Sequence, residues 1–322
     1  MNKRIAPSEA TASSALEVRG ALSHAVALGA RKFSSWPYLQ ALRPHQWIKN
    51  ALVALPAIAG HNFSVGTLAT VLIAIVSFSL CASSAYLIND MLDLPHDRAH
   101  PQKRHRPIAA GTVPLNHAAM LTAATVMSSL ALAFALPPAF MGILAAYFML
   151  STVYTVFLKR KLMIDVVALA ALYGIRVLAG GAATGIPLSH WLVGFCFFIF
   201  LSLALVKRTT EMMTLPESSL DALMGRDYRR MDLQTIIALT AASGFVAVLV
   251  LALYVSSPEI AALYRHADLL WGICIILVYW LGRVCILTGR GEMHQDPVIF
   301  AVTDRISLLA GLAVVATFVV AL

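Results

Sequence analysis

The sequence predicts an all-α, polytopic membrane helical bundle with about nine transmembrane helices. Hydrophobic residues make up 59% of its 322 residues, charged residues make up only 12%, and the mean hydropathy is +0.78. A chain of this length cannot bury so much apolar surface in a soluble core, so we expect lipid to cover part of it. Every span is expected to be a helix, because no ten-residue segment alternates as a membrane β-strand would.

Residues 1–35 come before the first apolar run. They are rich in Ala and Ser and carry scattered Arg residues. They contain no long apolar segment of the kind found in a secretory signal, and Glu9 and Glu17 argue against a transit peptide. We therefore expect 1–35 to form a flexible cytoplasmic tail. The remaining residues, 36–322, are expected to form one transmembrane domain, because no internal repeat divides them.

Nine apolar runs account for the expected spans, since a transmembrane helix needs roughly 20 apolar residues. The first run is the weakest, because Pro56 interrupts it. All four cysteines lie inside apolar runs without CxxC spacing, so we expect neither a disulfide framework nor a zinc site. In chain order, the expected spans are about 46–62, 67–88, 115–135, 138–158, 163–184, 188–206, 234–255, 267–288 and 303–322.

The basic residues gather on one side of the membrane when the N-terminus is placed in the cytoplasm. Of the 24 Lys and Arg residues, only Arg176 and Arg265 lie away from the cytoplasmic segments and the adjoining helix ends. The positive-inside rule predicts this asymmetry, which explains the net charge of +8 without a nucleic-acid partner. We expect a multi-pass protein of the inner (cytoplasmic) membrane whose charged loops face the cytoplasm. The cytoplasmic segments are 1–45, 89–114, 159–162, 207–233 and 289–302.

Four oxygen-bearing residues stand at the end of the second expected span: Asn89, Asp90, Asp93 and Asp97. Asn89 and Asp93 are four residues apart on a helix. Asp90 and Asp97 are seven apart with Asp93 between them, so one helix face carries the whole set. Carboxylates so close together repel one another unless a cation lies among them, and oxygen ligands favour magnesium. A solvated acidic helix end is the alternative for any one carboxylate, but the set predicts a Mg²⁺ site completed by substrate phosphates.

The pattern Asn89-Asp90-x-x-Asp93-x-x-x-Asp97, after the second of nine helices, resembles that of the UbiA-type membrane prenyltransferases. The resemblance implies a UbiA-like helical bundle around a central cavity, a cytoplasmic cap and magnesium held through Asn89 and Asp93. It also makes Asp90, Asp93 and Asp97 the candidate catalytic residues. Most members of this family use a prenyl diphosphate to alkylate an aromatic ring.

The loop after the sixth expected span departs from the pattern of that family. Most members carry a second Asp-rich motif there. In this sequence Asp221, Asp227 and Asp232 are well separated and alternate with Arg residues. We therefore do not expect two magnesium ions to bracket a prenyl diphosphate.

Several other segments are similar to the decaprenyl-phosphate phosphoribosyltransferase branch of the family. The similarity runs from about residue 40 to 322 and implies that a polyprenyl phosphate is the nucleophile. Phosphoribosyl diphosphate would supply the electrophilic anomeric carbon, and diphosphate would leave. The product would be an arabinose precursor for cell-envelope polysaccharide. The similar segments are 42–50, 99–111, 296–305, Lys159-x-x-x-x-x-Asp165 and Arg176-x-x-Ala179-Gly180-Gly181.

Ten residues are expected to bind these substrates. A leaving diphosphate needs cationic donors beside the metal, which the string from Lys103 to Arg106 can supply. A lipid phosphate needs a basic residue near its headgroup and an apolar groove for its chain. The ten residues are Lys49, Tyr86, Lys103, Arg104, Arg106, Tyr154, Lys159, Arg176, Lys207 and Arg208.

Some of these residues have structural alternatives. Arg176 lies well inside a span, where an Arg costs roughly 2.5–3.5 kcal/mol, so it is expected to contact either substrate or Asp165. Lys207 and Glu211 have the spacing of an exposed i,i+4 pair. The two tyrosines of the set lie where aromatic belts form at membrane interfaces. Gly180-Gly181 fits close helix packing as well as approach to substrate.

Two other functions are weighed against phosphoribosyl transfer. The first is transfer of a prenyl group from a prenyl diphosphate to an aromatic acceptor. The second is transport or lipid carriage, which is disfavoured because neither broken helices nor internal repeats are found. The sequence leaves the oligomeric state open, a homo-oligomer included, and does not define the lipid chain length.

Overall fold

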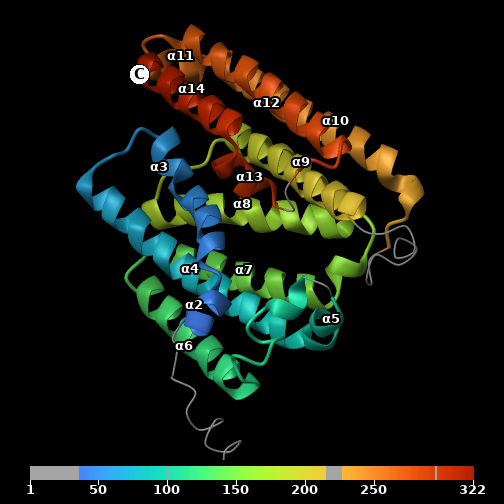
Figure 1. Ribbon diagram of the computed structural model, residues 1–322. Helices are drawn as coiled ribbons and strands as arrows, with labels where there is room; N and C mark the ends of the chain where they lie inside the picture. The colour runs from blue at the N-terminus through green and yellow to red at the C-terminus, as the bar shows by residue number, and fades with distance from the viewer. Residues whose placement is uncertain (1–35, 101, 215–226, 294–295) are drawn as a thin grey trace, which may run out of the picture.

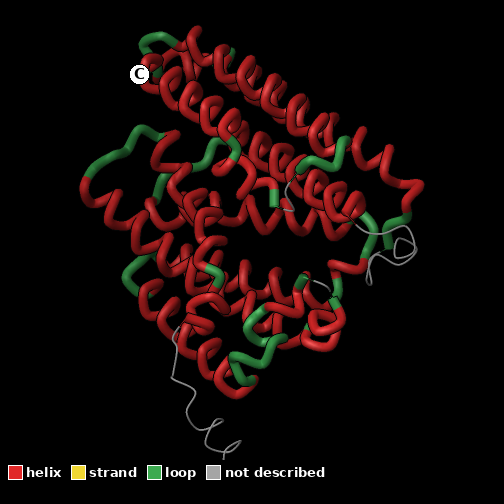
Figure 2. The backbone as a smooth tube through the Cα atoms, in the orientation of Figure 1, coloured by secondary structure: helices red, strands yellow, loops and turns green. Residues whose placement is uncertain are grey.

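The computed structural model describes residues 36–100, 102–214, 227–293 and 296–322. Every regular element among them is a helix, as Figure 2 shows, which confirms the all-α prediction. The expected tail, residues 1–35, lies outside the described residues. So does 215–226, which holds part of the loop where the second Asp-rich motif was sought.

Among the described residues, seven helices are long and apolar enough to cross a membrane. An eighth candidate is the pair α13 (Pro297–Thr303) and α14 (Arg305–Ala321), whose axes are bent by 80°. The count is therefore seven or eight rather than the nine expected, although each expected run after the first corresponds to one of these elements. The seven are α4 (Val65–Leu92), α6 (Leu115–Ala133), α7 (Pro138–Val156), α8 (Ile164–Thr184), α9 (His190–Thr214), α10 (Leu233–Val255) and α12 (Trp271–Gly289).

The first expected span, 46–62, is not a long α-helix. It consists of the 11-residue 3-10 helix η1 (Pro44–Ala54) followed by the short α3 (Leu55–Ala59). A 3-10 helix rises roughly 2.0 Å per residue, so η1 and α3 in line would still reach roughly 30 Å. The segment packs against α4 and α8. A Cβ atom at Gly180 would lie 2.0 Å from the Val53 carbonyl oxygen, so this glycine is needed for close packing.

The long helices follow one another around the molecule, as Figure 1 shows. α4 packs against both α6 and α7, and then α8, α9, α10, α12 and α14 each contact the helix before them. The ends of α4, α7 and α9 and the start of α8 lie on the same side, which we call the charged end. The short elements are α2 (Trp36–Leu42), α5 (Leu94–Ala99), η2 (Lys103–His105), η3 (Leu158–Arg160), η5 (Arg230–Asp232), α11 (Pro258–Leu263) and η6 (Ala267–Leu270).

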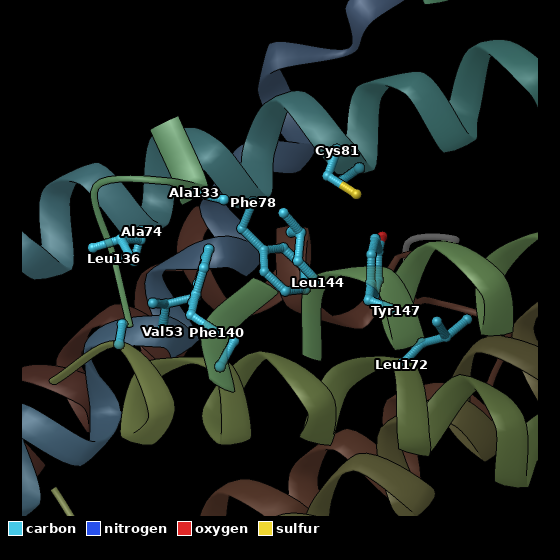
Figure 3. Packing of buried hydrophobic residues seen from close by; sticks show 13 residues of the cluster. Val53, Ala74, Phe78, Cys81, Ala133, Leu136, Phe140, Leu144, Tyr147 and Leu172 are labelled. Atoms are coloured by element: carbon cyan, nitrogen blue, oxygen red, sulfur yellow. The ribbon is translucent and has the colours of Figure 1, made fainter. Parts of the chain in front are cut away.

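The buried apolar residues form two main clusters that meet at α8. In the first, Phe78 of α4 faces Tyr147 of α7 with ring centroids 4.5 Å apart, and Val53 lies beside Phe140 (Figure 3). The second joins α8, α9, α10 and α12. Large apolar side chains on the outer faces of α6, α12 and α14 are exposed, as expected where lipid replaces water. The chain is thus a multi-span helical membrane protein.

Candidate active site

Residues from several elements meet at the charged end. Lys159 of η3 contacts Asp93 at the end of α4. Lys103 of η2 lies within electrostatic range of Glu211 near the end of α9. Three chain segments that are far apart in the sequence are therefore neighbours here.

The three carboxylates of the Asn89–Asp97 pattern differ in their basic partners. α4 ends at Leu92, and α5 restarts at Leu94 with a proline in its first turn. Asp90 and Asp97 are both buried and both accept hydrogen bonds from Arg106 Nη1, at 3.1 and 2.6 Å. Asp93 instead contacts Lys159. The three carboxylates therefore have different basic partners, which the sequence did not predict.

Arg43 is a site residue that the sequence interpretation missed. Its guanidinium donates to both oxygens of Asp90, at 2.5 and 2.8 Å, and its Cζ lies 5.2 Å from the centre of the Tyr86 ring. Its backbone is left-handed (φ 55°) immediately before Pro44, a conformation that costs a non-glycine residue energy. Its place in the similar segment 42–50, just before the first span, was the available signal.

The residues best suited to a metal are Asn89 and Asp93. Lys159 Nζ lies 2.7 and 2.8 Å from the two oxygens of Asp93, so a cation already occupies the position in front of this carboxylate. The Asn89 amide makes no hydrogen bond to any described residue. Mg²⁺ usually takes only one or two oxygen ligands from the protein and the rest from water and substrate phosphates, so these two residues are sufficient. Across the described residues, no three His, Cys, Asp or Glu side chains are grouped to hold a metal alone. We call Asn89, Asp93 and Lys159 the Asp93 site.

The basic residues after α5, from Lys103 to Arg106, differ in burial and in their partners. Lys103 is partly buried: burial and Arg106 lower its pKa, while Glu211 and Asp97 partly offset this effect. Arg106 donates hydrogen bonds to Asp90 and Asp97. Arg104 is exposed, and among the described residues its side chain hydrogen-bonds only to His105.

A second pair of expected residues, Lys49 and Lys207, meets near α13. Lys49 is buried and donates to Asp296, just before α13. Burial would raise the pKa of Asp296, but Lys49 and Lys207 outweigh this effect and lower it. Lys207 also lies within electrostatic range of Tyr154. Asp296 was missed as a site residue, although it begins the similar segment 296–305. Nothing in the sequence indicates its partner, which is 247 residues away.

Arg176 is buried in the middle of α8 and does not pair with Asp165. Its guanidinium donates to Asn50 Oδ1 at 2.9 Å and to the Tyr147 hydroxyl at 3.2 Å, and it also bonds the Leu172 carbonyl. Asn50 in turn donates to Ser79 at 2.9 Å. Arg176 therefore ties η1 to α4, α7 and α8.

Asp165 is instead the partner of Arg208. Both side chains are 0% exposed, and their charged atoms lie 2.6 Å apart. Arg208 also pairs with Glu211, so Glu211 contacts Arg208 where a pair with Lys207 was considered. Tyr228, before α10, donates its hydroxyl hydrogen to Asp165. We call Asp165, Arg208, Glu211 and Tyr228 the Asp165 cluster, in which the Arg208 side chain is fully buried.

Comparisons with known proteins agree with this architecture. Residues 50–300 match the UbiA prenyltransferase family. The uncharacterized protein y4nM of Sinorhizobium fredii is 32% identical over 289 residues, which cover 88% of this chain and 56% of that relative. This chain therefore spans little more than half the length of y4nM. Nodulation protein NoeC of Azorhizobium caulinodans is 31% identical over 280 residues, or 87% of this chain and 91% of NoeC.

Two further similarities concern an enzyme and a solved structure. The decaprenyl-phosphate phosphoribosyltransferase of Mycobacterium tuberculosis is 38% identical over 179 residues, covering 54% of this chain and 59% of that protein. A UbiA homolog from Archaeoglobus fulgidus, solved with DMAPP and Mg²⁺, has the same fold, with a TM-score of 0.65 at 19% identity. The superposition covers 88% of this chain and 99% of that chain. Together with the helical bundle, the family match shows that this chain is a membrane protein belonging to the UbiA prenyltransferase family.

Proposed function

We propose that this enzyme transfers 5-phosphoribosyl from phosphoribosyl diphosphate to a polyprenyl phosphate, with Mg²⁺ as cofactor. The decaprenyl-phosphate phosphoribosyltransferase of M. tuberculosis, 38% identical over about half of this chain, supports the reaction. The Mg²⁺ of the A. fulgidus structure supports the cofactor. The product fits use as an arabinose precursor for cell-envelope polysaccharide.

The observation that carries this proposal is the surplus of positive charge at the charged end. No carboxylate oxygen of the described residues lies within ion-pair distance of Lys103 or Lys207. Lys159 and Lys49 each have one carboxylate partner among the residues that the structure describes. Phosphoribosyl transfer brings together a diphosphate, a 5-phosphate and the lipid monophosphate. It therefore needs more cationic groups than a single prenyl diphosphate does, and these lysines can supply them.

The expected reaction is a substitution at the anomeric carbon of the donor. A bond forms from an oxygen of the lipid phosphate to that carbon, while the bond from the carbon to the diphosphate oxygen breaks. Diphosphate leaves with its negative charge, which Lys103 and Lys159 are placed to receive. The lipid phosphate is already ionised near neutral pH, so no side chain has to remove a proton from it.

Asn89 and Asp93 are the residues that would hold Mg²⁺. When bound, the metal supplies charge stabilisation for the departing diphosphate. Lys159, which contacts Asp93 in this structure, would then move its ammonium to a phosphate oxygen. Asp90 and Asp97 orient Arg106 and Arg43, so their role is to position these cations.

The charged end is proposed to face the cytoplasm, where phosphoribosyl diphosphate is soluble. The distribution of Lys and Arg supports this orientation. Single cysteines introduced on a Cys-free background test this orientation. An impermeant thiol reagent applied to intact cells should label cysteines that replace the exposed Asn62 and Ser256, but not a cysteine that replaces the exposed Gln102. Labelling of Gln102 alone would reverse the orientation.

The donor is tested by offering purified enzyme two labelled substrates separately. Labelled phosphoribosyl diphosphate with a polyprenyl phosphate should give a labelled, acid-labile lipid only when Mg²⁺ is present. Labelled prenyl diphosphate with an aromatic acid should give no product. Prenylation of the acid, with no ribose transfer to any lipid tested, would instead establish the conventional family reaction, for which the A. fulgidus structure with DMAPP is the supporting observation.

A further inference from the structure

Lys49 contacts Asp296 and the Tyr173 ring, and Lys207 lies within electrostatic range of both; we call these four residues the Lys49–Lys207 site. They come from four elements: η1, α8, α9 and the segment before α13. Lys49 Nζ lies 5.6 Å from the centre of the Tyr173 ring and donates to Asp296. Lys207 lies within electrostatic range of both Asp296 and the Tyr173 hydroxyl.

The carboxylate of Asp296 already accepts three hydrogen bonds and pairs with a lysine, so it is poorly suited to bind a metal ion. Its Oδ1 accepts hydrogen bonds from the backbone N–H groups of Val298 and Ile299, at 3.0 and 3.4 Å, and so caps α13. Its Oδ2 accepts from Lys49. With one carboxylate and two lysines, the site keeps a net positive charge. The Asp93 site differs, because Asp93 and Lys159 neutralise each other and Asn89 remains free to bind a metal.

We infer that the Lys49–Lys207 site binds the monophosphate of the lipid acceptor directly, without a metal, while the Asp93 site binds the diphosphate of the donor. This inference rests on the proposed function and divides its phosphate groups between two subsites. Lys207 is the main phosphate contact, because it is the lysine of the pair without a carboxylate partner among the described residues. Asp296 is a positioning residue that holds Lys49 beside it.

The surroundings of the site suit a lipid monophosphate. Lys49 uses one of its three ammonium N–H groups on Asp296, so others remain for a phosphate oxygen. Tyr173 stacks on Phe200 with ring centroids 5.5 Å apart, and Val298 packs against the same apolar cluster. Apolar side chains therefore lie next to the lysines. This arrangement suits a ligand whose phosphate is joined directly to a prenyl chain. A diphosphate would bring more negative charge than this site can balance without a cation.

Lys207→Gln is the variant that tests the inference most cleanly. Lys207 forms no ion pair with a described residue, so its removal leaves no buried carboxylate without a partner. Lys49→Gln is a less specific test, because it would leave Asp296, the N-cap of α13, without its lysine partner. Lys161→Gln is the matched control, because Lys161 is an exposed lysine at the same end of the bundle. Lys207→Arg keeps the charge and should retain binding.

The experiment measures binding of decaprenyl phosphate and decaprenyl diphosphate to the full-length enzyme in nanodiscs containing EDTA. We expect wild type and Lys161→Gln to bind the monophosphate equally. Lys207→Gln should bind it about tenfold more weakly, a loss of about 1.4 kcal/mol. The diphosphate should bind well only after Mg²⁺ is added, and Asp93→Asn should abolish that gain. An unchanged affinity of Lys207→Gln for the monophosphate, or a requirement for Mg²⁺, would overturn the inference.

Activity assays on the same variants separate this inference from the proposed function. If Lys207→Gln loses monophosphate binding but the wild-type enzyme transfers no ribose phosphate, the site stands and the proposed reaction fails. If ribose phosphate is transferred and the KM for the lipid is the same in Lys207→Gln, the reaction stands and the site fails. The expected result is a lipid KM about tenfold higher with a donor KM within about twofold of wild type.

Discussion

The Asp93 site and the Asp165 cluster lie at the same end of the bundle, and in both a carboxylate is paired with a basic residue. They differ in burial. The side chain of Asp93 is 27% exposed and that of Lys159 is 16% exposed, whereas Asp165 and Arg208 are both 0% exposed. We therefore expect the Asp93–Lys159 pair to open for a ligand more readily than the buried Asp165–Arg208 pair.

This difference separates two roles that look alike in the sequence. A buried pair is costly to form, and removing one partner leaves an uncompensated charge. The Asp165 cluster is therefore expected to hold α8, α9 and the start of α10 together. An accessible pair costs little to open, so the Asp93 site is expected to serve chemistry. Substitutions in the Asp165 cluster should therefore mainly lower stability, and substitutions in the Asp93 site should mainly lower activity.

The largest expected effect comes from Arg208→Met. Asp165 would stay buried without its cation, and such a loss typically costs about 3–5 kcal/mol. We expect a sharply lower Tm in detergent and little purified protein. Arg160→Met, which removes an exposed arginine at the same end, should leave the Tm unchanged. Adding Asp165→Asn to Arg208→Met should restore part of the stability, and a Tm equal to wild type for Arg208→Met would show that the cluster holds nothing together.

Asp93→Asn should lower activity strongly while leaving stability almost unchanged. The side chain is partly exposed, so its loss should move the Tm by no more than about 2 °C. Removing a charged metal ligand should lower kcat by about 100-fold or more, and extra Mg²⁺ should not restore it. Asp268→Asn, an exposed carboxylate on η6, is the control and should be fully active. Near wild-type activity in Asp93→Asn would remove Asp93 from the metal site.

Much of the architecture could be predicted from the sequence, because long apolar runs have one stable form in lipid. The runs after the first became helices close to their expected bounds. The first run became η1 and α3, which depends on an approach of backbone to backbone at Gly180. A run of apolar residues carries no information about such a contact. The Asn89–Asp97 pattern located the candidate site because its residues are close in sequence.

The partners of the charged residues could not be predicted in the same way. Arg43 and Asp90 are 47 residues apart, and Lys49 and Asp296 are 247 apart, so only packing brings them together. Arg176 illustrates the difficulty. Asp165 was its natural partner by helix position, yet Asn50 and Tyr147 satisfy it and Arg208 takes the carboxylate. The depth of a charged residue in a span indicates that it needs a polar partner. It does not indicate which residue that partner is.

A smaller stability effect is expected from Tyr228→Phe. Burial and the contact with Asp165 raise the pKa of Tyr228, so its hydroxyl remains a donor to the carboxylate. Phenylalanine keeps the ring but removes this hydrogen bond, which to a charged acceptor is worth about 1.5–3 kcal/mol. We expect a lower Tm with the donor and lipid KM values unchanged. A large rise in either KM would mean that Tyr228 belongs to the substrate site.

The smallest expected effect concerns Lys103, which lies between the two regions. Lys103→Glu should raise the KM for phosphoribosyl diphosphate about tenfold, or about 1.4 kcal/mol, and should change the lipid KM less. Burial and Arg106 lower the pKa of Lys103, so its charge is lost at a lower pH than that of an exposed lysine. The donor KM of wild type should therefore rise as the pH increases through that lowered pKa.

Lys103→Arg distinguishes this titration from other effects of alkaline pH. An arginine stays protonated over the whole range, so its donor KM should remain flat where that of wild type rises. Lipid KM should follow the same course in both enzymes. If wild type and Lys103→Arg show the same rise in donor KM, the titrating group is elsewhere. Lys103 would then be grouped with the residues that stabilise the charged end, because its charge would not be needed for binding the donor.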